Sequence, residues 1–527
     1  MLHARKSLKG MVTAPHHLAA EAGAQILREG GNAIEAMIAA AAAIAVTYPH
    51  MNSIGGDAFW LISLPGRPPV GVRACGPAAR LATPEFYAEH DETIIPARGP
   101  RAALTVAGAV AGWAEALAIA REEAGRIPLS ALLADAIRYA QDGVPVTLSQ
   151  AMLTTQKWPE LRDVRGFRPT YAENGPPEEG AILKQPQLAA TLSQLAEAGL
   201  DDFYRGDLAR LMAKGLKAAG SPLRLADLKA FSASRVEPLS LDIRAGTLFN
   251  MPPPTQGVSS LMILGIFDRL GVTDAESFAH IHGLIEATKR AFILRNAHLG
   301  DPRRMAPAWR DWLGPDVLDR EAAAIDRKRA APWPHEGPAG DTIWMGAADS
   351  AGRVVSYIQS TYWEFGSGFV VPGTGIVWHN RGASFTLSDG PNALGPCRLP
   401  LHTLNAALAR LRDGRTLAYG TMGGEGQPQT QAAIFTRHVN FGGDMQAAVT
   451  APRWLLGRTW GAETTNLKLE SRFPTELIKA LDAAGHDIEL VDAFDDMMGH
   501  AGMVSIDAHG VISGATDPRA DGACAGL

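Results

Sequence analysis

The chain is poor in cysteine and has no large excess of charge of one sign. Its 527 residues include three cysteines, Cys75, Cys397 and Cys524. A set so small and odd in number gives no indication of a disulfide framework. The formal net charge is −6, which argues against a nucleic-acid partner, because such partners are bound by basic patches. A small anionic substrate is still compatible with this charge, since one or two arginines can bind it locally.

The sequence also lacks a signal peptide and a membrane span. Residues 1–9 carry positive charge, but the mixed sequence of 10–17 supplies no apolar core for a signal peptide. The alanine-rich stretch 34–46 is too short to cross a bilayer and contains Glu35, so it predicts a buried helix instead. We therefore expect no membrane association and a cytoplasmic location.

Cofactor and metal signatures are missing as well. No P-loop or dinucleotide fingerprint occurs, and residues 365–368 do not form a G-x-S-x-G elbow. The pairs His16-His17 and His280/His282 lack partner ligands at metal spacing in the sequence. We expect neither a metal nor a cofactor.

Local patterns predict a mixed α+β or α/β organisation. Helices are expected over 17–46 with a break at Gly30-Gly31, over parts of 106–143 and 185–230, and over 277–299 and 473–485. A hairpin is expected over 59–72, and strands with glycine-rich turns follow residue 342. The charged, proline-rich stretch 326–341 is typical of an exposed linker.

The most informative segment is a second predicted hairpin, which begins at Thr342. Residues 342–349 and 354–361 have strand character on either side of the turn 350–353. If the hairpin is centred on Ala351, Ser360 lies opposite Thr342, within reach of its hydroxyl. A threonine becomes a strong nucleophile when it is a chain terminus, because its own α-amine then serves as base. That would require cleavage after Asp341; the alternative is an ordinary strand threonine with a polar cross-strand neighbour.

The order and spacing of residues around this hairpin resemble the γ-glutamyltranspeptidase family of self-cleaving N-terminal-nucleophile hydrolases. The resemblance covers essentially the whole chain. It implies an α+β fold, a four-layer αββα sandwich built jointly by two fragments, 1–341 and 342–527, that stay associated as a heterodimer and could assemble further. It is carried by Thr342, Asp349, Gly352, Ser360, Phe365-Gly366 and Gly375, and by the motifs at 17–23, 30–33, 54–57, 251–254, 299–302, 422–424 and 517–519.

The resemblance also implies roles for individual residues. Ser360 stands where the family has a threonine that bonds to the nucleophile. Gly423 and Gly424 match the glycines whose N–H groups stabilise the oxyanion, although a glycine pair can be a simple turn. Arg73 matches the arginine that grips the substrate carboxylate, although a lone arginine at a strand end can be a surface residue.

Other pocket positions depart from the family members that handle glutamate. Those members have an asparagine where Tyr362 stands, a glutamine at Arg381 and two serines at His402 and Thr403. Where they carry the acid that binds the substrate ammonium, this chain has Ser384. The changes fit a small acid with a carboxylate and an amide but no α-amino group. His402 could equally be a hydrogen-bonded core histidine.

These residues together favour a self-processing threonine amidohydrolase. Thr342 would attack the amide, its amine would accept the proton, and Arg73, Tyr362, Arg381, His402 and Thr403 would line the substrate site. The resemblance to cytoplasmic members of the family, together with the altered pocket, implies hydrolysis of oxamate to oxalate and ammonia, a step in purine-ring breakdown. The alternatives are a γ-glutamyl hydrolase or transferase acting on glutathione, an acylase for β-lactam side chains, and a non-catalytic relative that only binds.

Overall fold

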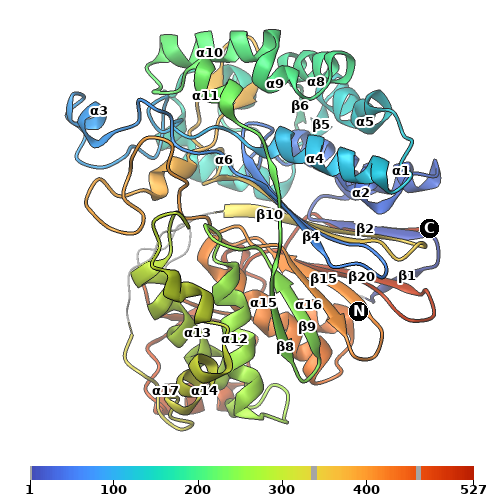
Figure 1. The fold of residues 1–527 in the computed structure, drawn as a ribbon, viewed down its shortest axis with the longest axis vertical. Helices are drawn as coiled ribbons and strands as arrows, with labels where there is room; N and C mark the ends of the chain where they lie inside the picture. The colour runs from blue at the N-terminus through green and yellow to red at the C-terminus, as the bar shows by residue number, and fades with distance from the viewer. Residues whose placement is uncertain (1–2, 334–340, 458–463) are drawn as a thin grey trace.

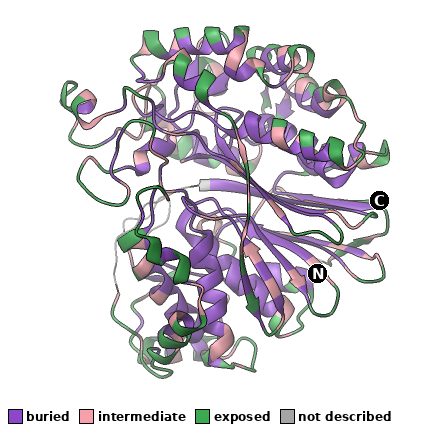
Figure 2. Ribbon diagram, viewed as in Figure 1, coloured by how far each residue is buried: buried purple, intermediate pink, exposed green. Residues whose placement is uncertain are grey.

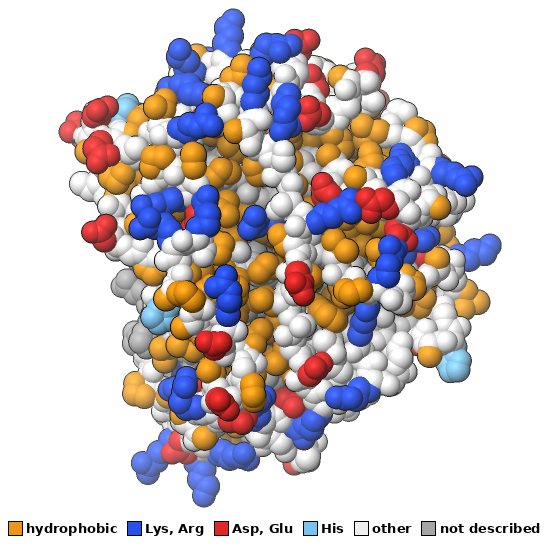
Figure 3. All heavy atoms as spheres, viewed as in Figure 1, with side chains coloured by type: hydrophobic (Ala, Val, Ile, Leu, Met, Phe, Trp, Pro, Cys, Tyr) orange, Lys and Arg blue, Asp and Glu red, His pale blue; other side chains and the backbone are white. Residues whose placement is uncertain are grey.

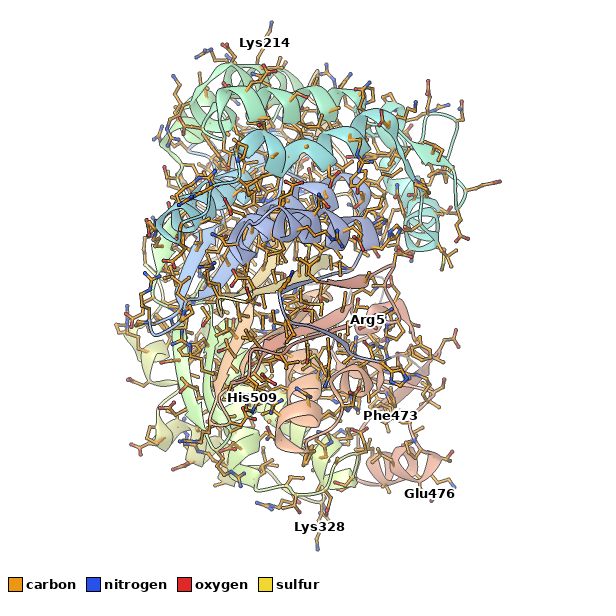
Figure 4. All side chains as sticks on the ribbon, turned by 90° about the vertical axis from the view of Figure 1, so that its right-hand side faces the viewer. Arg5, Lys214, Lys328, Phe473, Glu476 and His509 are labelled. Carbon is orange, nitrogen blue, oxygen red and sulfur yellow. The ribbon has the colours of Figure 1, made fainter. Side chains whose placement is uncertain are left out.

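Two seven-stranded sheets pack face to face, and helices cover the outer face of each (Figure 1). The computed structural model of the chain describes residues 3–333, 341–457 and 464–527. The layers run from α10, which carries Lys214, to the opposite end of the molecule near Lys328 (Figure 4). The architecture is α+β and confirms the expected αββα sandwich.

The first sheet, called sheet I, carries the hairpin that begins near Thr342. Strands from the two ends of the chain form one edge of the sheet, and the long hairpin strands lie at its centre. The order is β21 (Ala523–Gly526), β2 (Gly10–Ala14), β10 (Asp341–Asp349), β11 (Val354–Tyr362), β3 (Asp57–Ser63), β4 (Val70–Ala74) and β7 (Ser234–Val236).

The second sheet, sheet II, contains the strand that leads into the loop with Gly423 and Gly424. Like sheet I, it mixes strands from before and after Thr342, so neither part of the chain forms a complete sheet alone. The order is β1 (Arg5–Ser7), β20 (Ile512–Thr516), β19 (Ala501–Ile506), β15 (Thr416–Thr421), β14 (Ala407–Leu411), β9 (Gly246–Asn250) and β8 (Leu239–Ile243).

The helices form two outer layers. On the sheet I side lie α1 (His17–Arg28), α2 (Ala33–Thr47), α4 (Ala109–Glu122), α5 (Leu129–Asp142), α8 (Pro186–Ala198) and α10 (Asp207–Ala219), with the shorter α9 (Asp202–Arg205) and α11 (Leu225–Ala230). On the sheet II side lie α12 (Gly257–Leu270), α13 (Phe278–His298), α14 (Pro315–Ala323), α15 (Gln427–Phe435), α16 (Met445–Thr450) and α17 (Thr475–Ala483). The helix α6 (Leu148–Leu161) belongs to the first group.

Three apolar layers hold the sandwich together, and central strands such as β3 and β11 are buried on both faces (Figure 2). The middle layer, between the sheets, includes Phe59, Trp344 and Ile358. These residues share the inner face of sheet I with Asp57, Thr342 and Ser360, because side chains alternate along a strand. The functional side chains therefore lie at one end of the interface between the sheets.

Trp344 fixes how closely the sheets approach near Thr342. Its indole Nε1 donates to Ser356 Oγ at 3.0 Å. A Cβ at Gly420 or Gly502 of sheet II would lie 2.2 and 2.5 Å from the indole ring, distances that side chains do not tolerate. Glycine at both positions lets the ring fit between the sheets two residues from Thr342.

The hairpin has the predicted centre but an irregular end. Ile343 pairs with Gln359 and Ala348 with Val354, as expected for a turn centred on Ala351. The register then shifts, so that Asp341 pairs with Tyr362. Ser360 and Thr361 both lie opposite Thr342 in this bulge. The simple one-to-one pairing of Thr342 with Ser360 is therefore wrong, and their hydroxyl contact stays a prediction.

The other predicted elements are largely found. The helix break at Gly30-Gly31, the long helix α13, the helix α17 and the hairpin β3–β4 are all present. Of the expected linker 326–341, residues 326–332 are mostly exposed, and 334–340 lie outside the described residues. Within the described residues, no helix combines the length and apolarity needed to cross a membrane.

On the face of the molecule shown in Figure 3, acidic and basic side chains are interspersed.

Candidate active site

Thr342 is completely buried near the start of β10. Gln427, the first residue of α15, donates from Nε2 to Thr342 Oγ1 at 3.2 Å. The amide oxygen of Gln427 is fixed in turn by the backbone N–H of Asn405 at 3.1 Å. The side chain of Gln427 therefore links the Thr342 hydroxyl to the backbone just before β14, and Gln427 itself directly follows the loop that precedes α15.

That loop contains Gly423 and Gly424. Gly423 has a φ of 112° and Gly424 a φ of 51°, left-handed conformations that glycine adopts without strain. Among the described residues, no acceptor is found for the N–H of either glycine. Two such donors beside a nucleophile can stabilise an oxyanion.

A buried polar network holds this loop in place. Gln256 Nε2 donates to Gly424 O at 2.8 Å and to Thr403 O at 2.7 Å. Arg295 of α13 donates to Gln256 Oε1 at 2.8 Å and forms an ion pair with Glu425 at 3.0 Å. Arg295 of α13 thereby holds Glu425 directly, and it holds the carbonyl of Gly424 through Gln256.

Asp57 is a fully buried carboxylate at the start of β3, directly opposite Ser360. Its Oδ1 accepts from Gly76 N at 3.3 Å and Gly108 N at 3.0 Å. Burial alone would raise the pKa of Asp57, but His379 and His402 hold that pKa well below its usual range. Asp57 is therefore ionised.

Two histidines meet the other oxygen of Asp57. His402 Nε2 lies 3.0 Å from Asp57 Oδ2, and His379 Nδ1 lies 3.4 Å from the same oxygen. Burial, followed by Arg381, outweighs the carboxylate and lowers the pKa of His402 to about 4. The His402 imidazole is therefore neutral at neutral pH.

Arg381 is the most unusual side chain of the site. It is 1% exposed, and its Nη1 donates to Thr403 Oγ1 at 3.1 Å. Its guanidinium carbon lies 3.4 Å from the centre of the Tyr362 ring. Within the described part of the chain, its Nε and Nη2 atoms are buried without a hydrogen-bond partner. Burial lowers the pKa of Arg381, but an arginine stays charged.

Arg73 lies on β4 opposite Phe59, half-buried on the inner face of sheet I. Burial first, and then Asp57, raises the pKa of Cys75, whereas Arg73 and Arg381 lower it. The Cys75 thiol is thus within electrostatic reach of Asp57 and both arginines. Among the described residues, no ion pair or side-chain hydrogen bond of Arg73 is found.

The structure places the predicted residues at the same end of the sandwich. One of them, Ser384, makes a contact that does not fit the role of the residue it replaces. Ser384 donates to Leu401 O at 3.3 Å, so its hydroxyl is not a substitute for an acid that binds ammonium. Sequence reasoning missed His379, Gln256, Arg295 and Gln427 as members of the site. It treated Asp57 only as part of a motif, although a charged residue after Gly55-Gly56 was a signal that could have been followed.

A histidine cluster elsewhere corrects another expectation. His282 does have partner ligands: His282 Nδ1 lies 2.9 Å from His486 Nε2, and Glu286 is beside them. The Lys289 ammonium, however, lies 2.7 Å from Glu286 Oε1, and His282 Nε2 lies 2.9 Å from Asp326 O. The Lys289 ammonium already supplies the positive charge beside Glu286, so we assign no metal to this cluster.

Known proteins are similar to this chain in both sequence and fold. The family described as "Gamma-glutamyltranspeptidase" matches residues 19–527. The oxamate amidohydrolase proenzyme of Klebsiella pneumoniae is 54% identical over 99% of both chains. The glutathione hydrolase-like YwrD proenzyme of Bacillus subtilis is 37% identical over 98% of both. The crystal structure of cephalosporin acylase from Bacillus halodurans superposes with a TM-score of 0.92 at 33% identity, covering 100% of this chain and 97% of that one.

Proposed function

The chain belongs to the gamma-glutamyltranspeptidase family, and we propose on this premise that it hydrolyses the amide of a small carboxylate-bearing acid. The substrate that best fits is oxamate, which gives oxalate and ammonia. The enzyme is an autoprocessed amide hydrolase with Thr342 as its nucleophile. Its cytoplasmic location and its place in purine-ring breakdown form part of this proposal.

The observation that carries the substrate class is the buried Arg381. A guanidinium taken out of water is costly unless an anion or hydrogen-bond acceptors compensate it. The Tyr362 ring supplies part of that compensation through its π face, but Nε and Nη2 have no hydrogen-bond partner among the described residues. A small ligand with a carboxylate would supply the missing acceptors through two parallel hydrogen bonds. Arg73 offers a second cation on the same face of sheet I.

The proposed reaction begins with cleavage of the Asp341–Thr342 bond, which makes Thr342 an N-terminus. The free amine then takes the proton of Oγ as Oγ attacks the amide carbon. The N–H groups of Gly423 and Gly424 stabilise the oxyanion. The amine returns its proton to the departing nitrogen, ammonia leaves, and water hydrolyses the resulting ester to regenerate Thr342.

The burial of Thr342 supports an inactive precursor. In the continuous chain its side chain has 0% exposure, so no substrate reaches Oγ. Cleavage would free the segment before Thr342 to move away from the site. The fragments 1–341 and 342–527 would remain together because both contribute strands to each sheet.

A second candidate function is acylase activity toward β-lactam side chains, favoured by the close superposition on cephalosporin acylase. Glutathione hydrolysis is less well supported, because Ser384 offers no carboxylate for an α-ammonium group. A relative that only binds would not need the N–H donors of Gly423 and Gly424 beside a buried threonine.

The deciding experiment compares kcat/KM for oxamate, a γ-glutamyl anilide and a cephalosporin on one processed preparation. We expect oxamate to exceed the other two by at least tenfold. A higher value for the γ-glutamyl anilide or the cephalosporin would show that the pocket around Arg381 and Ser384 has been misinterpreted. The unprocessed Thr342→Ala variant gives the background of ammonia release.

A further inference from the structure

Asp57 and His402, 345 residues apart in sequence, form a buried pair beside the proposed nucleophile. Asp57 pairs across the sheet with Ser360, which lies opposite Thr342 in the bulge. His402 Nε2 lies 3.0 Å from Asp57 Oδ2, and both side chains are 1% exposed. The His402 and Phe59 rings pack edge to face, with ring centres 4.8 Å apart.

The pair fixes which nitrogen of His402 carries hydrogen. An ionised carboxylate can only accept hydrogen bonds, so Nε2 is the N–H donor to Asp57. Because the pKa of His402 is lowered to about 4, the ring carries one hydrogen at neutral pH. Nδ1 therefore has a free lone pair, and it is buried with no hydrogen-bond partner among the residues that the structure describes.

One charged donor that acts on the His402 ring is Arg381, whose charge helps to lower the pKa of His402. His402 directly precedes Thr403, whose hydroxyl accepts from Arg381 Nη1. The unpaired Nε and Nη2 of Arg381 and the half-buried Arg73 offer only N–H groups. A buried acceptor without a donor is unfavourable, so a ligand that both accepts from guanidinium and donates to an imidazole would complement these groups.

We propose that Asp57 is a positioning residue that keeps His402 Nδ1 unprotonated, so that Nδ1 accepts a hydrogen bond from the carboxamide NH₂ of the substrate. The inference rests on the proposed function, because it takes oxamate as the ligand. It gives the site a means to distinguish substrate from product. The amide of oxamate donates to Nδ1, whereas the new carboxylate of oxalate has no hydrogen to donate and faces a lone pair.

The variant Asp57→Asn tests this inference by reversing the tautomer. The N–H groups of Gly76 and Gly108 require an acceptor, so the amide oxygen would face them and the NH₂ group would face His402. Nε2 then becomes the acceptor, and Nδ1 carries the hydrogen. We expect KM for oxamate to rise about tenfold and the inhibition constant of oxalate to fall, so that their ratio changes more than tenfold.

The ratio of KM for oxamate to the inhibition constant of oxalate is independent of the fraction of active enzyme, so partial misfolding does not imitate the effect. If Asp57→Asn fails to fold, His402→Phe keeps a ring against Phe59 but removes Nδ1, and it should also abolish the preference for oxamate. His280→Gln is the control, since His280 is buried against Thr436 away from the site. A ratio within twofold of wild type in folded variants overturns the inference.

A readout that needs no substrate separates this inference from the proposed function. Histidine-selective ¹⁵N NMR, with the His402 signal assigned through His402→Phe, reports the tautomer directly. A hydrogen on Nδ1 in the wild type at pH 7 overturns the role of Asp57, whatever the substrate. A different outcome would overturn the proposed substrate alone. In that outcome the wild type does not hydrolyse oxamate, but His402 carries its hydrogen on Nε2, and the protein binds another primary amide better than the corresponding carboxylic acid.

Discussion

Arg381 lies over Tyr362, with its guanidinium carbon 3.4 Å from the ring centre. Tyr362 adopts a φ of 83°, which is strained for a bulky side chain and costs roughly 1–3 kcal/mol. Asparagine tolerates this backbone conformation better. The backbone strain at Tyr362 therefore occurs where the Tyr362 ring packs against the buried Arg381 guanidinium. The strained residue is thus part of the proposed ligand site.

The first prediction concerns the Asp341–Thr342 bond. Purified protein should separate into fragments 1–341 and 342–527, and intact mass spectrometry should find Thr342 as a new N-terminus. Thr342→Ala should abolish both cleavage and turnover because the hydroxyl serves in both, whereas Thr342→Ser should retain some of each. Complete processing of the alanine variant would mean that another protease makes the cut.

The second prediction concerns Arg381. Arg381→Met keeps an apolar stem against Tyr362 but removes the donors to the ligand. Losing a charged hydrogen bond costs about 1.5–3 kcal/mol, so kcat/KM for oxamate should fall roughly ten- to a hundredfold. Arg73→Ala should also weaken substrate binding.

Cleavage at Thr342 should proceed in both arginine variants, because it involves no free carboxylate substrate. Gel analysis of the processed fragments gives this control. Unchanged kcat/KM in Arg381→Met would remove Arg381 from the ligand site.

The third prediction concerns the buried ion pair of Arg295 and Glu425. Arg295→Met leaves the Glu425 carboxylate buried and uncompensated, which should destabilise the fold by about 3–5 kcal/mol. Arg235, whose ion pairs with Glu115 and Glu122 lie at the surface, is the matched control. Arg235→Met should cost roughly 1 kcal/mol or less, and urea unfolding measures both.

If Arg295→Met is no less stable than Arg235→Met, the ion pair of Arg295 with Glu425 does not stabilise the loop that contains Gly423 and Gly424. Adding Glu425→Gln to Arg295→Met should recover part of the loss, since the buried charge is then removed.

Several features of this site could be predicted from sequence, and others could not. The turn of the β10–β11 hairpin is local, because Asp349 and Gly352 define it, so its centre at Ala351 was predictable. The bulge opposite Thr342 was not, because the register there is decided by packing between the sheets. Asp57 and His402 meet only through the fold, and no periodicity links residues so far apart.

The fourth prediction concerns acid stability. The pKa of His402 in the folded protein is about 4, below its ordinary value of 6.5. Between these values the unfolded chain binds a proton that the folded chain does not, so stability falls as pH decreases from 6.5 to 4 and the loss levels off below 4. A shift of this size corresponds to roughly 3 kcal/mol.

Urea unfolding of the wild type and His402→Phe at pH 7, 5.5 and 4.5 measures this contribution. The variant should lose less stability over the same range, because it lacks the titrating ring. Parallel losses in both proteins would assign the acid sensitivity to other buried histidines, such as His16 and His280, whose pKa values are lowered to about 3.

The pairing of β21 with β2 brings the two ends of the chain together. Leu527 O accepts from the backbone N–H groups of Leu8 and Lys9, and Leu527 N donates to Gly10 O. A circularly permuted gene could therefore join residue 527 to the N-terminal region through a short linker and begin at Thr342. Once the initiator methionine is removed, such a chain would carry its threonine amine from synthesis onward, and activity would no longer depend on breaking a peptide bond.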